Sequence, residues 1–157
     1  MIAAWRLALA ALLLAGPAAP VVAQPAEADD LVQFIHVAGP LTARARTGGE
    51  VPAEKAIAIT RRDGQLIVTT MYALWSHEWE DPPEGTIAVM RTRARSSSGG
   101  PEPADLDYAQ RTGVRLFIVG EWADPPPIWE LERHSDGMRI RDIDAEGRPG
   151  AWRTGTE

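Results

Sequence analysis

Short runs of apolar and β-branched residues, separated by turn residues, cover most of the chain and predict strands. The clearest pair is Lys55–Thr60 (KAIAIT) and Gln65–Trp75, which flank Asp63-Gly64. An Asp-Gly pair between two apolar runs is a strong hairpin signal, because glycine tolerates the positive φ that a tight turn demands. The pattern therefore predicts a β-hairpin that turns at Asp63-Gly64.

Five further segments have the same β-branched and aromatic character, which favours strands over helices. They are Leu31–Val37, Thr86–Arg95, Val114–Glu121, Ile128–His134 and Met138–Ile143. Gly39-Pro40 is expected to end the first of these segments. The last two flank Ser135-Asp136-Gly137, which predicts a second hairpin.

One short helix is expected, over Asp105–Arg111, with Asp105 as its N-cap and Gly113 as its stop. The pattern as a whole therefore predicts an all-β protein with at most one short helix. Its seven or so strands, nearly all antiparallel and rich in hairpins, favour a small antiparallel β-barrel or a β-sandwich. Residues 31–157 are expected to form a single β-rich domain, which is an ordinary size for one core.

The apolar run near the start of the chain has a different character. Leu7–Ala15 follows Arg6 and precedes Val21-Val22-Ala23, and a positive start, an apolar run and a small-residue cleavage site form a secretory leader. Two prolines interrupt the run well before the ~20 residues that a membrane span needs. We expect residues 1–23 to be a signal peptide, residues 24–30 to be a flexible mature N-terminus, and the mature protein to have no stable membrane insertion.

The amino-acid composition limits which cellular location, partners and site chemistry are expected. The sequence contains no cysteine, which excludes disulfides, a thiol nucleophile and a thiolate metal site. The net charge is −6, which disfavours nucleic acid as a partner. Basic charge is almost wholly arginine, with Lys55 the only lysine, a bias typical of GC-rich bacterial genomes. A bacterial protein that is periplasmic or secreted is expected.

A short motif, EWxDPP, occurs at Glu78–Pro83 and again at Glu121–Pro126. Each copy follows an apolar strand and precedes another, which suggests an internal repeat. In a structural interpretation, the Asp before Pro-Pro closes a turn and the Trp caps the core. In a functional interpretation, the two turns form a ligand-binding end, because indoles beside acids stack on sugars or enclose a cationic group. The residues of this predicted site are Trp79, Trp122, Asp81 and Asp124.

Three functions are compatible with these features. The favoured one is an exported, non-catalytic binding or interaction module, without a cofactor, whose partner is a small molecule, a glycan or an envelope protein. The first alternative is a small hydrolase in which Glu78 and Glu121 act on a glycoside, since that chemistry needs two carboxylates that flank one bond. The second alternative is a structural component of an envelope assembly, joined through exposed sheet edges.

Two motifs begin like metal sites and then depart from them. His77–Asp81 starts like the HExxH zinc motif, but it ends in Asp and is followed by two prolines that prevent the required helix. Asp142–Gly147 starts like a calcium loop, but Arg153 stands at the twelfth position, where a glutamate ligand belongs. A solvated β-turn is expected there instead. The histidines (His36, His77 and His134) have no ligand spacing, and no metal is expected.

Arg91, Arg93 and Arg95 alternate along one predicted strand and therefore share a face. Such a stripe suits an anion, but Glu130 and Glu132 alternate in the same way on another strand. We expect the arginines to form exposed cross-strand pairs with these acids, which contribute little energy each.

The predicted leader is open to a direct test. Expression of the full chain in a bacterial host is expected to deliver a mature protein that begins at Gln24 to the periplasm, as measured by intact mass. Leu13→Arg is the control, because a charge in the apolar run should block export. A periplasmic protein that retains residues 1–23 contradicts the prediction.

Overall fold

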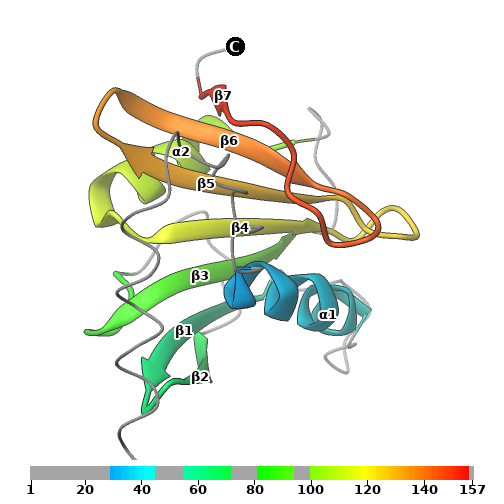
Figure 1. Ribbon diagram of the computed structural model, residues 1–157, viewed down its shortest axis with the longest axis horizontal. Helices are drawn as coiled ribbons and strands as arrows, with labels where there is room; N and C mark the ends of the chain where they lie inside the picture. The colour runs from blue at the N-terminus through cyan, green and yellow to red at the C-terminus, as the bar shows by residue number, and fades with distance from the viewer. Residues whose placement is uncertain (1–28, 45–54, 72–80, 94–99, 156–157) are drawn as a thin grey trace, which may run out of the picture.

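The computed structural model describes residues 29–44, 55–71, 81–93 and 100–155. In these ranges, seven strands form one open mixed sheet in the order β2-β1-β3-β4-β5-β6-β7, accompanied by two helices (Figure 1). The elements are α1 (Asp30–Arg44), β1 (Ala56–Arg62), β2 (Gln65–Met71), β3 (Thr86–Arg93), α2 (Pro103–Thr112), β4 (Arg115–Gly120), β5 (Ile128–His134), β6 (Gly137–Ile143) and β7 (Arg153–Thr154).

The prediction of a mostly β chain is confirmed. β1 to β6 correspond to the predicted strands that follow residue 54, and both predicted hairpins are present, β1 with β2 and β5 with β6. Asp63 and Gly64 have φ values of 51° and 78°, as expected for a two-residue turn that needs positive φ at both positions. The two-residue strand β7 was not predicted.

The finer prediction of a barrel or a sandwich is not confirmed. All strands of the described ranges belong to one sheet, with β2 and β7 at its two ends. The pairings are antiparallel except that of β3 with β4, which is parallel. Parallel neighbours need a crossover connection, and α2 provides it between β3 and β4.

The predicted strand Leu31–Val37 is wrong, because this segment lies in the 15-residue helix α1. The buried residues of α1 are Leu31, Val32, Ile35 and Gly39. This spacing places them on one side of a helix, whereas alternate residues would be buried in a half-buried strand. The β-branched content of the segment favours a strand, whereas the spacing of its buried residues is that of a helix.

The ends of α1 also differ from expectation. Asp29 caps the helix, since its Oδ1 accepts a hydrogen bond from the backbone N–H of Leu31 at 3.2 Å. Asp29 and Asp30 were assigned to the flexible segment 24–30, and here they cap and begin α1. Pro40, predicted with Gly39 to end the segment, lies inside the helix.

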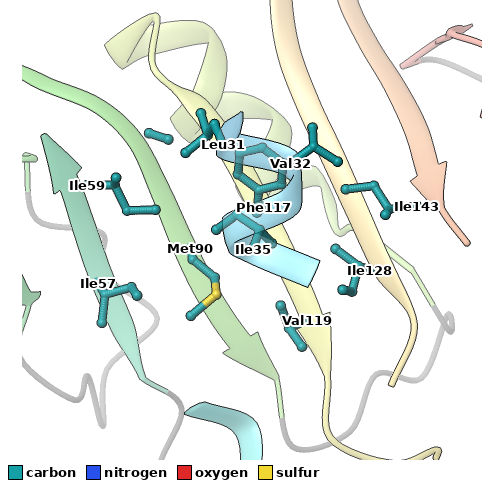
Figure 2. Close-up of a cluster of buried hydrophobic side chains, with 11 residues drawn as sticks. Leu31, Val32, Ile35, Ile57, Ile59, Met90, Phe117, Val119, Ile128 and Ile143 are labelled. Atoms are coloured by element: carbon teal, nitrogen blue, oxygen red, sulfur yellow. The ribbon is translucent and has the colours of Figure 1, made fainter. Parts of the chain in front are cut away.

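α1 covers one face of the sheet, in front of the central strands in Figure 1. Its buried side chains meet those of the sheet in an apolar cluster, and Figure 2 shows Ile35 next to Phe117. Gly39 permits a close approach, because a Cβ at this position would lie 3.0 Å from Cγ2 of Val119. The buried members of the cluster are Leu31, Val32, Ile35, Ile57, Ile59, Ala88, Met90, Phe117, Val119, Ile128 and Ile143.

α2 packs against the opposite face of the sheet. Val89 in β3 and Leu116 in β4 alternate with residues of the first cluster, so their side chains point to this second face, where they form a second cluster with α2. The predicted helix is confirmed, although it starts two residues earlier than expected. Glu102 is its N-cap, and Asp105 is the third residue of a capping box. Gly113 ends the helix in the left-handed conformation, as predicted.

Arg91 and Arg93 lie on the α2 face, and the prediction that they form exposed pairs with Glu130 and Glu132 is wrong. Both arginines are buried, and both bind the fully buried carboxylate of Asp105. The Nη2 atom of Arg93 is 2.7 Å from Oδ2 of Asp105, and Nη1 of Arg91 is 3.4 Å from Oδ1. Arg95 lies outside the described residues.

The predicted acids instead find partners on the α1 face. Glu130 is fully buried between Arg115 and Arg141, each of which donates through Nε at 2.7 Å. Glu132 pairs with Arg139. The predicted pairing fails because β4 separates β3 from β5, and because Glu130 faces α1 while Arg91 and Arg93 face α2.

Asp105→Ala is expected to lower the free energy of unfolding by about 3 to 5 kcal/mol, because it leaves two buried guanidinium groups without their shared carboxylate. Asp107→Ala is the matched control on the exposed side of α2, with an expected change of about 0.5 kcal/mol or less. Urea unfolding followed by circular dichroism measures both. Equal effects of the two substitutions would contradict the structural role of the Asp105 pair.

Candidate functional site

The connection from β4 to β5 contains the second copy of the repeated motif. We define the β4–β5 corner as residues 120–127 together with Trp129. It lies at the carboxyl ends of β3 and β4, because these strands run parallel and Arg93 aligns with Gly120. In open sheets, ligands commonly bind outside the carboxyl ends of parallel strands. The topology therefore makes this corner the first candidate for a site.

Trp122 is the most exposed aromatic residue of the corner and is 36% exposed. Its ring stacks on that of Trp129, with centroids 5.9 Å apart and planes inclined by 30°. Gly120 makes room for it, because a Cβ at this position would lie 2.7 Å from Cη2 of Trp122. Trp122 is thus a partly exposed indole that packs against the ring of Trp129 and against the backbone of Gly120.

Two carboxylates accompany this indole. Asp124 is exposed and forms an ion pair with Arg44 in the last turn of α1, and its peptide bond to Pro125 is cis. The Oε1 atom of Glu121 is buried and has no hydrogen-bond partner among the described residues. A buried carboxylate oxygen without a hydrogen-bond partner costs free energy, so Glu121 destabilises the corner.

The predicted site residues are not all gathered here. Trp79 and Glu78 lie outside the described residues. Asp81 pairs with Arg111 near the end of α2, where β4 begins, whereas Asp124 lies where β4 ends. Asp81 and Asp124, the described aspartates of the two motif copies, therefore lie toward opposite ends of strand β4.

The predicted ligand site and the predicted pairing of Glu78 with Glu121 therefore stay predictions. In the parts of the chain that the structure describes, the two copies of the motif do not occupy equivalent connections. Trp129 and Gly120 were not predicted as site residues. Their positions in the sequence are the signal that could have indicated them as site residues, since Gly120 immediately precedes the motif and Trp129 comes shortly after three prolines.

Titratable groups elsewhere are engaged in the fold. Burial raises the pKa of Asp105, against the opposing effect of the Glu102 backbone N–H and the two arginines. Burial also raises the pKa of Tyr108 to about 12. For Asp29, burial opposes a lowered pKa, but hydrogen bonding and charge from Arg115 prevail. Each shift follows from packing.

No group of three His, Cys, Asp or Glu side chains within the described ranges is arranged to hold a metal ion. His134 contacts Asp136, and His77 lies outside these ranges. The calcium-like segment forms the predicted β-turn, since the N–H of Gly147 donates to the carbonyl of Asp144 at 3.0 Å. The Asp144 carboxylate also accepts backbone hydrogen bonds from Glu146 and Arg148.

Comparisons with protein-family models, curated proteins and solved structures found no match to this chain. Neither α1 nor α2, the helices of the described ranges, is long and apolar enough to cross a membrane.

Gly120→Ala is expected to displace the Trp122 indole, because the new methyl group would lie within 2.9 Å of Trp122 and Pro127. The cost should be about 1 to 3 kcal/mol of unfolding free energy, accompanied by loss of the near-ultraviolet circular dichroism of the stacked pair. Gly150→Ala is the control, since its Cβ would approach no atom closer than 3.4 Å. An unchanged spectrum for Gly120→Ala would show that the stacking is not as described.

Proposed function

We propose that this protein is an exported, non-catalytic binding module that recognises its ligand at the β4–β5 corner. The observation that carries the proposal is the 36% exposed indole of Trp122, backed by Trp129 and Gly120 at the carboxyl ends of two parallel strands. A side chain that serves only as a core cap gains from complete burial. A rigidly backed and partly exposed indole is suited to stacking on a ligand.

The acids around the indole favour a particular ligand chemistry. Asp124 is exposed and pairs with Arg44, and the side chain of Glu121 is the second carboxylate of the corner. Aromatic faces attract cations, and neighbouring carboxylates increase that attraction. A ligand that presents a cationic or flat apolar group, on a small molecule, a glycan or an envelope protein, fits this corner best.

The two fully buried carboxylates of the described residues are engaged in ion pairs. Asp105 and Glu130 are each held by two arginines, which leaves neither carboxylate free as an acid or a base. The hydrolase alternative requires Glu78, which lies outside the described residues, so its pairing with Glu121 stays a prediction. Export itself follows from the leader and is part of the proposal.

The test compares retained ligand in the wild-type protein and in Trp122→Ala. Both are purified from a native bacterial envelope and analysed by native mass spectrometry, and tetramethylammonium and a neutral oligosaccharide are titrated as probes by tryptophan fluorescence. Trp122→Ala is expected to remain folded and to lose the retained mass and at least about tenfold in probe affinity, as for a stacking contact.

Trp152→Ala is the matched control, because Trp152 packs under Arg139 and Arg141 and is no part of the corner. It should keep the ligand. Equal retention by Trp122→Ala and the wild type, or collapse of the fold on this substitution, would leave Trp122 as a structural residue and overturn the proposal.

A further inference from the structure

The two ends of the sheet differ in how they are protected against further pairing. β7 is only two residues long, and its Arg153 is paired with Asp142 at 2.8 Å. β2 is seven residues long, has the sequence QLIVTTM without charge or proline, and pairs with β1 over its whole length without a bulge. Short length, charge, proline and bulges are the devices that keep sheet edges apart, and β2 has none of them.

β2 is also apolar on the outside. Ile67 is 37% exposed and Val68 is 44% exposed, and as neighbours in a strand they point to opposite faces of the sheet. Within the described ranges, no strand or helix lies beyond β2. Both faces of this edge therefore present aliphatic surface to solvent.

The register with β1 defines which backbone groups point outward. Arg62 and Gln65 close the two-residue hairpin as a mutually hydrogen-bonded pair, and hydrogen-bonded and non-bonded pairs alternate from there. Residues 65, 67, 69 and 71 therefore bond to β1. The N–H and C=O groups of Leu66, Val68 and Thr70 point away from β1, and no described strand lies on that side to pair with them.

We propose that two copies of this chain pair through the outer edges of their β2 strands, antiparallel and about a two-fold axis at Val68. In this register Val68 lies opposite Val68 of the partner subunit, and Leu66 lies opposite the partner subunit's Thr70. The outward-pointing backbone groups then face one another directly, as an antiparallel ladder requires. Ile67 lies opposite the partner subunit's Thr69 on the other face.

A second copy suits this edge because the strand is complementary to itself. Every cross-strand pair in this register combines uncharged residues, several of them β-branched, so no like charges meet although each chain carries a net charge of −6. A two-fold contact uses the same β2 edge of both copies, so no β2 edge is left for a third copy. The protected β7 ends prevent further addition, so the assembly stops at a dimer with one continuous sheet.

This dimer is independent of the ligand proposal. The β4–β5 corner lies three strands away from β2 in the sheet, so it stays accessible in both copies. A failure to find a ligand would leave the dimer intact, and a monomeric protein would leave the ligand proposal intact.

The test uses the mature chain and measures its mass against concentration by sedimentation velocity. The wild type is expected to be a dimer, and Val68→Lys is expected to weaken dimerisation by about tenfold or more, because like charges meet across the axis. Val37→Lys is the matched control, since Val37 is a 63% exposed valine on α1, and it should dimerise as the wild type does. An equimolar mixture of Val68→Lys and Val68→Glu should recover the dimer as a heterodimer.

Hydrogen exchange tests the same contact without a substitution. The amides of Leu66, Val68 and Thr70 should become protected as the wild-type concentration rises through dimerisation. A wild type that stays monomeric, a Val68→Lys variant that dimerises unchanged, or outward amides that exchange freely in the dimer would each overturn the proposal.

Discussion

Buried carboxylates held by pairs of arginines are the interactions on which this structure depends. Asp105 on the α2 face and Glu130 on the α1 face are both fully buried, and an ionised carboxylate in the interior is costly unless it is paired and hydrogen-bonded. Each therefore requires two guanidinium groups from the sheet. The fold has to bring these groups together, and in doing so it positions both helices.

The two networks attach the helices at defined points. On one face, Asp105 joins the N-terminus of α2 to Arg91 and Arg93 of β3 and also completes the capping box of its own helix. On the other face, Arg115 binds both Glu130 and Asp29, the cap of α1. Helix caps and buried ion pairs thus share residues, so a change in either network alters both helix position and sheet packing.

The two proposed surfaces lie outside this central scaffold. The β4–β5 corner uses a rigidly backed indole at the end of the parallel strand pair, while the β2 edge uses an unprotected strand at one end of the sheet. Buried ion pairs hold both helices on the central strands of the sheet, and neither the corner nor the β2 edge takes part in these pairs. The proposed ligand site and the proposed dimer contact therefore use separate parts of the same sheet.

The sequence by itself determined the elements whose signals are local. The first hairpin follows from its Asp63-Gly64 turn, and the end of α2 follows from Gly113, because these residues act through their own backbone conformations. The second hairpin was also predicted, although it turns at Ser135-Asp136 and Gly137 already pairs with His134. The candidate site was half visible, since the motif marked Trp122 and Asp124 but not Trp129 or Gly120, which join the corner through packing.

Tertiary structure decided whatever depends on residues distant in sequence. Leu31–Val37 has strand-like composition, yet the need to cover the face formed by Phe117 and Met90 makes it a helix capped by Asp29. The pairing of Arg91 and Arg93 with Asp105 instead of Glu130 follows from strand order, which places β4 between β3 and β5. Local propensity amounts to about a few tenths of a kcal/mol per residue. Burying an apolar face stabilises the fold by several kcal/mol, and leaving a buried charge without its partner costs a similar amount, so the long-range terms prevail where the two conflict.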